Sequence, residues 1–203
     1  MFREIVLTAI AIGLFIPVSV QAAISEDVVK ETIIKHSIEM DIDPALALSI
    51  AKKESGFKHE LKSPHGAVGV FQLLPSTAKR MGYNPYYLSE NVKAGLTYYK
   101  MMYKMFGSTE LALAAYNAGP GNVKKFGGTI PPYGETKRFV NVIMQNYNSL
   151  KANPDPIMSK YAQKPAIAPG VPMNLKTTPK PVDAPDSAEV PEVRQSEPVM
   201  EIL

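Results

Sequence analysis

Apolar side chains recur every three or four positions through most of residues 25–150, and this spacing constrains the fold more than any other feature of the chain. It is the spacing of helices that bury one face. Signals for helix ends fit the same segments: the pair Asp43-Pro44 is typical of a helix start, and Gly56 and Gly107 are typical of helix ends. Six helices are predicted, beginning at or beside Ser25, Asp43, Pro75, Ser89, Ser108 and Thr136. The sequence therefore predicts a mainly α fold.

The fourth and fifth predicted helices differ in how much of their surface is apolar. The fourth has one inward face, which includes Tyr103 and Phe106. Residues 108–118 are apolar nearly all round, which predicts a central buried helix that ends at Gly119-Pro120-Gly121. Only residues 66–74 lack the helical spacing, and their glycines predict a turn or a small β element.

The prolines divide the chain into a folded domain and a tail. Ten of the 18 prolines lie in residues 151–203, together with a single aromatic residue, Tyr161. Such a stretch buries too little apolar surface to offset the entropy lost on ordering. We therefore predict a folded domain at residues 23–150 and a disordered, proline-rich tail at residues 151–203. At the other end, a short basic start and an apolar run over residues 5–18 predict a signal peptide at residues 1–22 and export, with an uncleaved anchor as the alternative.

Charge and composition exclude several classes of function. A net charge of +3 is too small for a dedicated nucleic-acid binder. The absence of cysteine excludes a thiolate nucleophile, a cysteine-ligated metal site and a disulfide framework. His36, His59 and His65 have no histidine four residues away and no carboxylate cluster beside them, so we expect structural or solvent roles for them and neither a metal nor a cofactor.

Glu54 is the residue that most favours a catalytic role. The apolar face of the second predicted helix runs through Leu46 and Ile50, and the next position on that face is Glu54, whereas Lys53 points elsewhere. Burial and the negative end of the helix dipole would both disfavour the ionised carboxylate and raise its pKa. A carboxyl group that keeps its proton near neutral pH is what a general acid requires. The alternative is a glutamate that turns to solvent at the end of its helix.

Five segments, in the correct order, make the chain resemble the catalytic domain of lytic transglycosylases, whose fold is shared with goose-type lysozyme. The segments are residues 47–57 (ALSIAKKESGF), 66–75 (GAVGVFQLLP), 91–99 (NVKAGLTYY), 114–121 (AAYNAGPG) and 130–136 (IPPYGET). The resemblance covers about residues 44–142, which is nearly the whole predicted domain. It implies a lysozyme-like, mainly α fold with a small irregular or β element.

The same resemblance implies roles for individual residues. Glu54 would be the single catalytic acid. The expected substrate-binding residues are Ser55, Ser63, Phe71, Gln72, Tyr116 and Asn117, with the last two beside the acid at the cleavage point. Two positions depart from the family pattern: Phe71 stands where methionine is usual, and Phe139 stands where tyrosine is common.

The implied reaction is the cleavage of peptidoglycan glycan strands at the MurNAc-GlcNAc β-1,4 bond without water, giving 1,6-anhydroMurNAc ends. No cofactor is implied, and we expect a monomer in the periplasm of a Gram-negative bacterium. One alternative is a hydrolytic muramidase, for which Glu60, Glu90, Glu110 and Glu135 are candidates for a second carboxylate. The other is a peptidoglycan-binding component of an envelope-spanning secretion, conjugation or pilus system, which the protein would contact through its tail.

Overall fold

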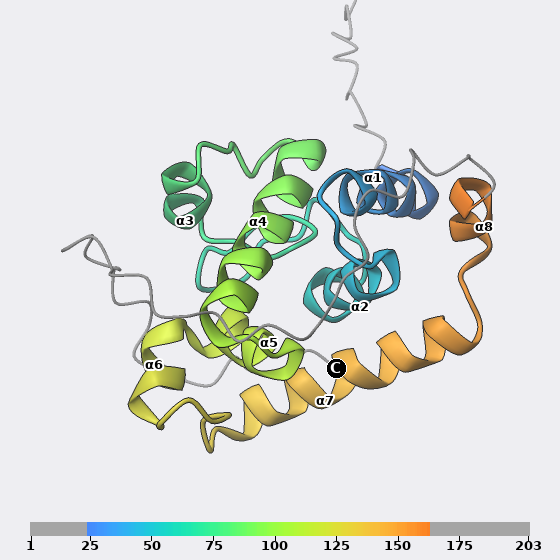
Figure 1. Ribbon diagram of the computed structural model, residues 1–203. Helices are drawn as coiled ribbons and strands as arrows, with labels where there is room; N and C mark the ends of the chain where they lie inside the picture. Colours follow the sequence, from blue (N-terminus) through green and yellow to red (C-terminus); the bar gives the residue numbers. More distant parts are fainter. Residues whose placement is uncertain (1–23, 163–203) are drawn as a thin grey trace, which may run out of the picture.

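The structure, a computed structural model, describes residues 24–162 (Figure 1). Over these residues it is helical, apart from two isolated antiparallel β-bridges that join Val68 to Lys62 and to Leu73. The helices are α1 (Glu26–Glu39), α2 (Pro44–Ser55), α3 (Pro75–Arg80), α4 (Leu88–Phe106), α5 (Thr109–Ala118), α6 (Pro120–Lys125), α7 (Gly134–Ala152) and α8 (Pro156–Ala162). The predicted signal peptide and residues 163–203 of the predicted tail lie outside the described residues.

Local signals in the sequence account for the helix ends that were predicted best. The Ser25 hydroxyl accepts from the Val28 amide at 3.4 Å, and the Asp43 carboxylate accepts from the Ala45 amide at 2.9 Å. Gly56 ends α2 in the left-handed region at φ 58°, where a residue without a Cβ is favoured. These three helix ends are confirmed.

Two predicted helix starts are displaced because their hydroxyl groups bind elsewhere. α4 begins at Leu88, and the Ser89 hydroxyl lies 2.7 Å from His36 Nε2 on α1 instead of capping its own helix. α7 begins at Gly134, and the Thr136 hydroxyl donates to Asn117 Oδ1 at 2.8 Å. A side-chain oxygen that could cap a helix is equally able to join two segments of the fold, and here it does so.

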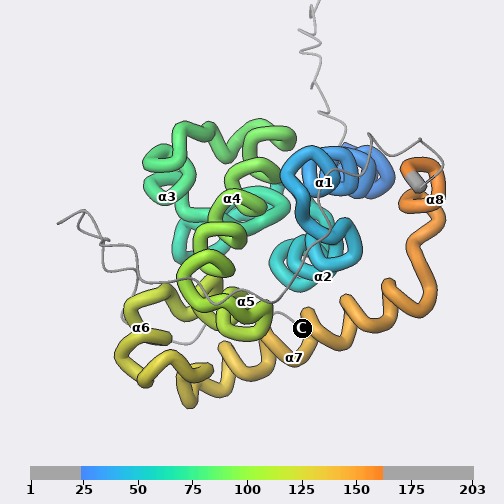
Figure 2. The backbone as a smooth tube through the Cα atoms, in the orientation of Figure 1, coloured from blue at the N-terminus to red at the C-terminus, as the bar shows by residue number. Residues whose placement is uncertain are grey.

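α5 lies between α4 and α7 and also packs on α6 (Figure 1). The fully buried side chains come from several helices, among them Ile50 of α2, Leu96 of α4, Leu113 of α5 and Ile143 of α7. Figure 2 shows that α2 and α5 both face the long α7, and that the chain between α2 and α3 passes behind α4. This central packing confirms the prediction of a buried fifth helix.

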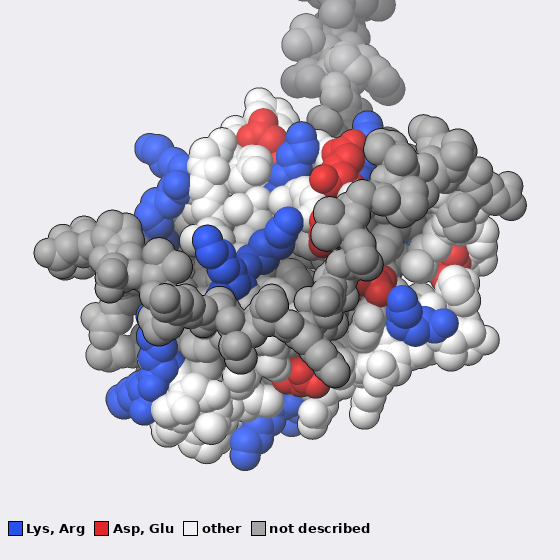
Figure 3. Space-filling model, in the orientation of Figure 1, with Lys and Arg blue, Asp and Glu red and all other residues white. Residues whose placement is uncertain are grey.

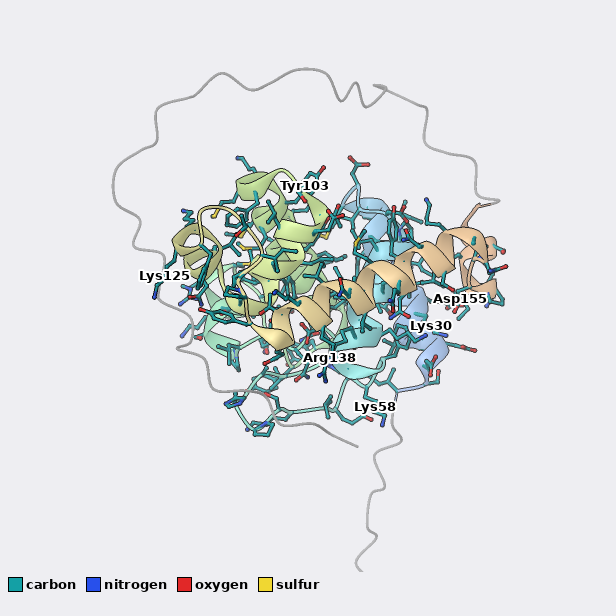
Figure 4. All side chains as sticks on the ribbon, turned by 90° about the horizontal axis from the view of Figure 1, so that it is seen from below. Lys30, Lys58, Tyr103, Lys125, Arg138 and Asp155 are labelled. Carbon is teal, nitrogen blue, oxygen red and sulfur yellow. The ribbon has the colours of Figure 1, made fainter. Side chains whose placement is uncertain are left out.

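The folded part extends beyond residue 150, where the sequence placed its end. α7 continues to Ala152, and α8 lies beside α1 with Ile157 only 8% exposed (Figure 1). Lys30 of α1 points toward Asp155 (Figure 4), and their Nζ and Oδ2 atoms are 3.0 Å apart. The prediction of disorder from residue 151 is therefore wrong for residues 151–162, because an apolar contact and an ion pair hold this segment on α1.

The surface of α4 also differs from the prediction. Tyr103 is 39% exposed, and Met101 and Met105 beside it are exposed as well. Tyr103 was expected inward, but only the ring of Tyr99, with its centroid at 6.1 Å, lies against it among the described aromatic rings. On the face shown in Figure 3, basic side chains stand in separate groups among acidic and uncharged surface.

Candidate active site

Glu54 lies in the last turn of α2 and is half-buried, whereas Lys52 and Lys53 are exposed. This is the difference that the apolar spacing of the helix predicts. Gly56 then turns the chain away from α2, so that the carboxyl group stands where the helix ends and the loop of residues 56–74 begins. The structure therefore confirms that position 54 continues the inward side of the helix.

Tyr116, near the end of α5, lies close enough to Glu54 to sense its charge. The phenol is 7% exposed, and burial raises its pKa well above 10; the negative charge of Glu54 raises this pKa further. The hydroxyl of Tyr116 therefore keeps its proton over the whole physiological range. The fold thus brings together an acid and a phenol that are far apart in the sequence, as the resemblance implied.

The Tyr116 hydroxyl is held by the backbone of the loop. It donates to the Phe71 carbonyl at 2.9 Å. The Tyr116 ring meets Tyr98 edge-on with centroids 5.1 Å apart and stacks on Phe139 at 6.5 Å. Phe139, which stands where the family often has tyrosine, is therefore part of the packing that fixes the phenol.

Two of the residues predicted to contact the substrate are buried and pack or hydrogen-bond within the protein. Phe71 has no exposed surface, so its side chain belongs to the core and does not form the predicted wall toward a ligand. Ser55 is also buried, and its hydroxyl donates to the Val70 carbonyl at 2.9 Å and to the Ala51 carbonyl at 3.2 Å. These residues attach the end of α2 and the phenol to the same stretch of loop.

Gln72 and Ser63 order the loop and remain half-buried at its surface. The Gln72 amide donates to the carbonyls of Gly69 at 2.8 Å and Leu61 at 3.1 Å, while its backbone adopts φ 43°. A positive φ is uncommon for a residue with a Cβ, so these hydrogen bonds help to hold a strained conformation. Ser63 accepts from the Ala67 amide at 3.0 Å, a contact within its own loop.

Asn117 follows Tyr116 and faces the start of α7. Its Oδ1 accepts from the Thr136 hydroxyl at 2.8 Å, and its Nδ2 lies 3.5 Å from Glu135 Oε1, at the limit of a hydrogen bond. The first contact orients the amide, and the second, at 3.5 Å, engages its N–H group only weakly. Asn117 is therefore a half-buried residue whose amide is oriented by the start of α7.

Asn91, which was not singled out from the sequence, is the polar centre of this region. Its amide is fully buried, donates to the carbonyls of Val68 at 2.9 Å and Pro85 at 3.1 Å, and accepts from the Phe71 amide at 2.9 Å. A signal was present: Asn91 and Gly95 lie four residues apart on one face of a helix that is otherwise apolar there. A glycine inside a helix often marks the close approach of another segment.

Searches for metal and membrane features cover residues 24–162. In that part of the chain, no group of three or more His, Asp or Glu side chains is placed to hold a metal ion. The same residues include no helix that is long and apolar enough to cross a membrane.

Comparisons with known proteins show which family the folded part of the chain resembles. The family model described as "Transglycosylase SLT domain" matches residues 31–131. The chain is 32% identical to the soluble lytic murein transglycosylase of Salmonella typhimurium, over 51% of this chain and 20% of that protein. It is 31% identical to the transglycosylase of Enterobacteria phage PRD1, over 65% of this chain and 48% of that protein. The chain thus spans about a fifth of the bacterial relative and about half of the phage relative.

Two solved structures share the fold. One is the 70-kDa soluble lytic transglycosylase of Escherichia coli, with a TM-score of 0.53 and 28% identity over 59% of this chain and 24% of that one. The other is an inactive mutant of the lytic transglycosylase Slt of Pseudomonas aeruginosa, in which glutamine replaces a glutamate. It gives a TM-score of 0.54 and 26% identity over 62% of this chain and 25% of that one. These matches confirm the predicted lysozyme-like, mainly α fold.

Proposed function

Because the folded part of this chain belongs to the transglycosylase SLT domain family, we propose that the protein is a peptidoglycan lytic transglycosylase with Glu54 as its catalytic acid. The observation that supports this most directly is the half-buried Glu54 at the end of α2, close enough to the phenol of Tyr116 to raise its pKa. The murein transglycosylases among its relatives support the substrate class. In the Pseudomonas enzyme, the replacement of one glutamate by glutamine accompanies loss of activity.

The proposed reaction uses one carboxyl group twice. Glu54 first donates its proton to the oxygen that joins MurNAc to GlcNAc, the bond from C1 to that oxygen breaks, and an oxocarbenium-like centre forms at C1. The carboxylate then takes the proton from the C6 hydroxyl of the same MurNAc, and the C6 oxygen bonds to C1. The products are a free GlcNAc hydroxyl and a 1,6-anhydroMurNAc end. No water is consumed, and the proton returns to the glutamate.

The surrounding polar groups are proposed to orient the sugar. The Asn117 amide is held by Thr136 and is half-buried, so its N–H groups are placed to donate to a sugar hydroxyl or acetamido oxygen. Gln72 and Ser63 stand half-buried on the loop that follows Glu54 and offer further polar contacts. Tyr116 and Ser55 donate to backbone carbonyls, so their hydroxyl protons hold the protein rather than the substrate.

The test is the digestion of purified sacculi, with the released muropeptides identified by mass spectrometry. We expect products that are lighter by one water than reducing-end fragments. Glu54→Gln should lower the rate by about 10²–10⁴-fold, the usual contribution of a general acid, while keeping the melting temperature near that of wild type. Glu60→Gln is the matched control, because Glu60 is an exposed carboxylate on the loop that follows α2. Normal activity of the purified Glu54→Gln protein would refute the assignment.

The hydrolytic alternative makes a different prediction for Glu135. Of the four candidates for a second carboxylate, Glu135 lies beside the site, with its Oε1 at 3.5 Å from Asn117 Nδ2. Glu110 stands in the first turn of α5, about 10 Å along the helix from Asn117 at a rise of about 1.5 Å per residue. Reducing-end products, together with loss of activity in Glu135→Gln, would favour a muramidase over a transglycosylase.

We also propose export to the periplasm and a recruiting role for the tail, since the sequence of residues 1–22 is typical of a signal peptide and residues 163–203 are rich in proline. A deletion that tests the tail should begin at residue 163, because residues 156–162 form α8 on the folded part. We expect the shortened protein to digest isolated sacculi at the wild-type rate and to lose its location or a partner in the cell envelope. No cleavage by either protein would favour the peptidoglycan-binding alternative.

A further inference from the structure

Asn91, on α4, joins the loop before α3 to the loop after α3. Its amide donates to the carbonyl of Val68, on the loop before α3, and to the carbonyl of Pro85, on the loop after α3. It accepts from the amide of Phe71. The side chain has no exposed surface, and each of its polar atoms has a partner of the right kind.

We propose that Asn91 is a positioning residue for the reaction: it fixes the backbone at Phe71, so that the Phe71 carbonyl can hold the hydroxyl of Tyr116 in place beside Glu54. The expected effect on the reaction rests on the proposed function. The structural role of Asn91 rests on its contacts with residues 68–71. The hydrogen bonds of Asn91 go to the backbone of Val68, Phe71 and Pro85, so its effect passes through the loop.

The loop has no room to move against α4. A Cβ added to Gly69 would lie 2.3 Å from Asn91 Nδ2, which shows that the backbone of the loop passes directly over the amide. A Cβ added to Gly95 would lie 2.3 Å from Cγ of Phe71, one turn further along α4. The loop of residues 68–71 therefore packs directly on α4. Asn91 supplies the hydrogen bonds of this contact, and Gly95 leaves the space for the Phe71 ring.

Phe71 transmits this placement to the site. Its amide donates to Asn91 at 2.9 Å, and its carbonyl accepts from Tyr116 at 2.9 Å, so one residue is held from both sides. Its fully buried ring prevents an independent shift. A displacement at Asn91 is thus expected to move the Tyr116 hydroxyl relative to the acid, and a misplacement of about 1 Å can cost about 10²-fold in rate.

The test is a double-mutant cycle that combines Asn91→Asp with Tyr116→Phe. The aspartate has the same shape but lacks the N–H donors to Val68 and Pro85. We expect Asn91→Asp to lower kcat on soluble glycan strands by about 10- to 100-fold with KM changed less than about 3-fold. In the Tyr116→Phe background the additional loss from Asn91→Asp should shrink to about 3-fold or less, because the link through which it acts is already broken. Ile33→Ala, a buried change on α1, is the control for general destabilisation and should leave kcat near wild type.

Two outcomes would overturn the proposal: losses that multiply in the double mutant, or a rise in KM with kcat unchanged. If Asn91→Asp does not fold, Asn91→Ser removes the same donors to the loop without burying a charge, and the cycle is repeated with it. Failure of the proposed function is distinguished by wild-type protein that releases no product. In that case hydrogen exchange decides: Asn91→Ser should speed exchange of the Phe71 amide by more than about 10-fold beyond Ile33→Ala, and equal exchange in the two would overturn the positioning role.

Discussion

Tyr116→Phe tests the link between the phenol and the loop with the removal of a single oxygen atom. The aromatic contacts with Tyr98 and Phe139 remain, and only the hydrogen bond of 2.9 Å to the Phe71 carbonyl is lost. A buried acceptor that loses its donor costs about 1–3 kcal/mol, so we expect a loss of about 2 kcal/mol in the free energy of unfolding. For a folded part of this size, about 4 °C per kcal/mol gives a fall of about 8 °C in the melting temperature.

Differential scanning calorimetry at neutral pH measures this change. The high pKa of the Tyr116 phenol, which follows from burial and from the charge of Glu54, keeps the wild-type hydroxyl a donor throughout the scan. Tyr103→Phe is the matched control: the same atom is removed from a side chain that is 39% exposed, and the melting temperature should move by about 1 °C or less. We further expect Tyr116→Phe to lower kcat by about 10- to 100-fold, as for Asn91→Asp, which acts through the same bond. A melting temperature equal to that of the control would refute the claim that this bond supports the site.

The remaining predictions concern the start of α2 and the close contact between α4 and the loop that follows α2. Burial of the Asp43 carboxyl raises its pKa, but hydrogen bonds led by the one from Lys151 outweigh this and hold the pKa below its usual value of 3.8. Folding thus favours the ionised form of Asp43, and Asp43→Asn should lower the free energy of unfolding by about 1 kcal/mol or less at neutral pH. The difference in melting temperature between this variant and wild type should disappear as the pH falls through the pKa of the folded state. A difference that stays constant down to pH ~2 would contradict a lowered pKa for Asp43. Gly95→Ala should destabilise the fold by about 1–3 kcal/mol in urea unfolding, because its Cβ would meet Phe71 at 2.3 Å. Gly121→Ala is the control and should be nearly neutral, because its Cβ would meet nothing within 4 Å. Equal urea midpoints for the two variants would show that Phe71 does not pack tightly against α4.

The sequence predicted the helices well where a local signal for a helix end was used. It failed at α8, where the proline content of a whole segment was used in place of that signal. Asp155-Pro156 begins α8 just as Asp43-Pro44 begins α2: the aspartate accepts from the amide two residues on, Ile157 in one case and Ala45 in the other. The proline count over residues 151–203 hid this signal. Prolines are evidence against a packed segment only when they do not stand at the first position of a helix, and Pro156 stands there.

The same distinction explains Gly119-Pro120. It ends α5, as predicted, but Pro120 is also the first residue of α6, a short helix that the sequence did not predict. A proline fits the start of a helix because its missing N–H would have no partner there. One pair of residues thus carries two signals, and only the stop was used in the prediction.

For the site, periodicity could place Glu54 on the inward side of α2, but it could not show what holds the site together. The bond from Tyr116 to Phe71 joins residues 45 positions apart, and that from Asn91 to Phe71 joins residues 20 positions apart. Pattern along a single helix carries no information on such pairs. This is also why Phe71 was expected at the substrate, where the resemblance put it, although its side chain is wholly buried.

The contacts that hold the acid, the phenol and α4 meet on two consecutive residues. The Ser55 hydroxyl, next to Glu54, donates to the Val70 carbonyl; Tyr116 donates to the Phe71 carbonyl; and the Phe71 amide donates to Asn91. Three helices are thus tied to one short piece of backbone that belongs to none of them. The distance between two packed helix axes depends on the side chains at their contact and varies with them. These hydrogen bonds instead hold backbone atoms at about 2.9 Å from their partners. The relative placement of the Glu54 carboxyl and the Tyr116 hydroxyl therefore depends on residues 70 and 71 more than on any single helix.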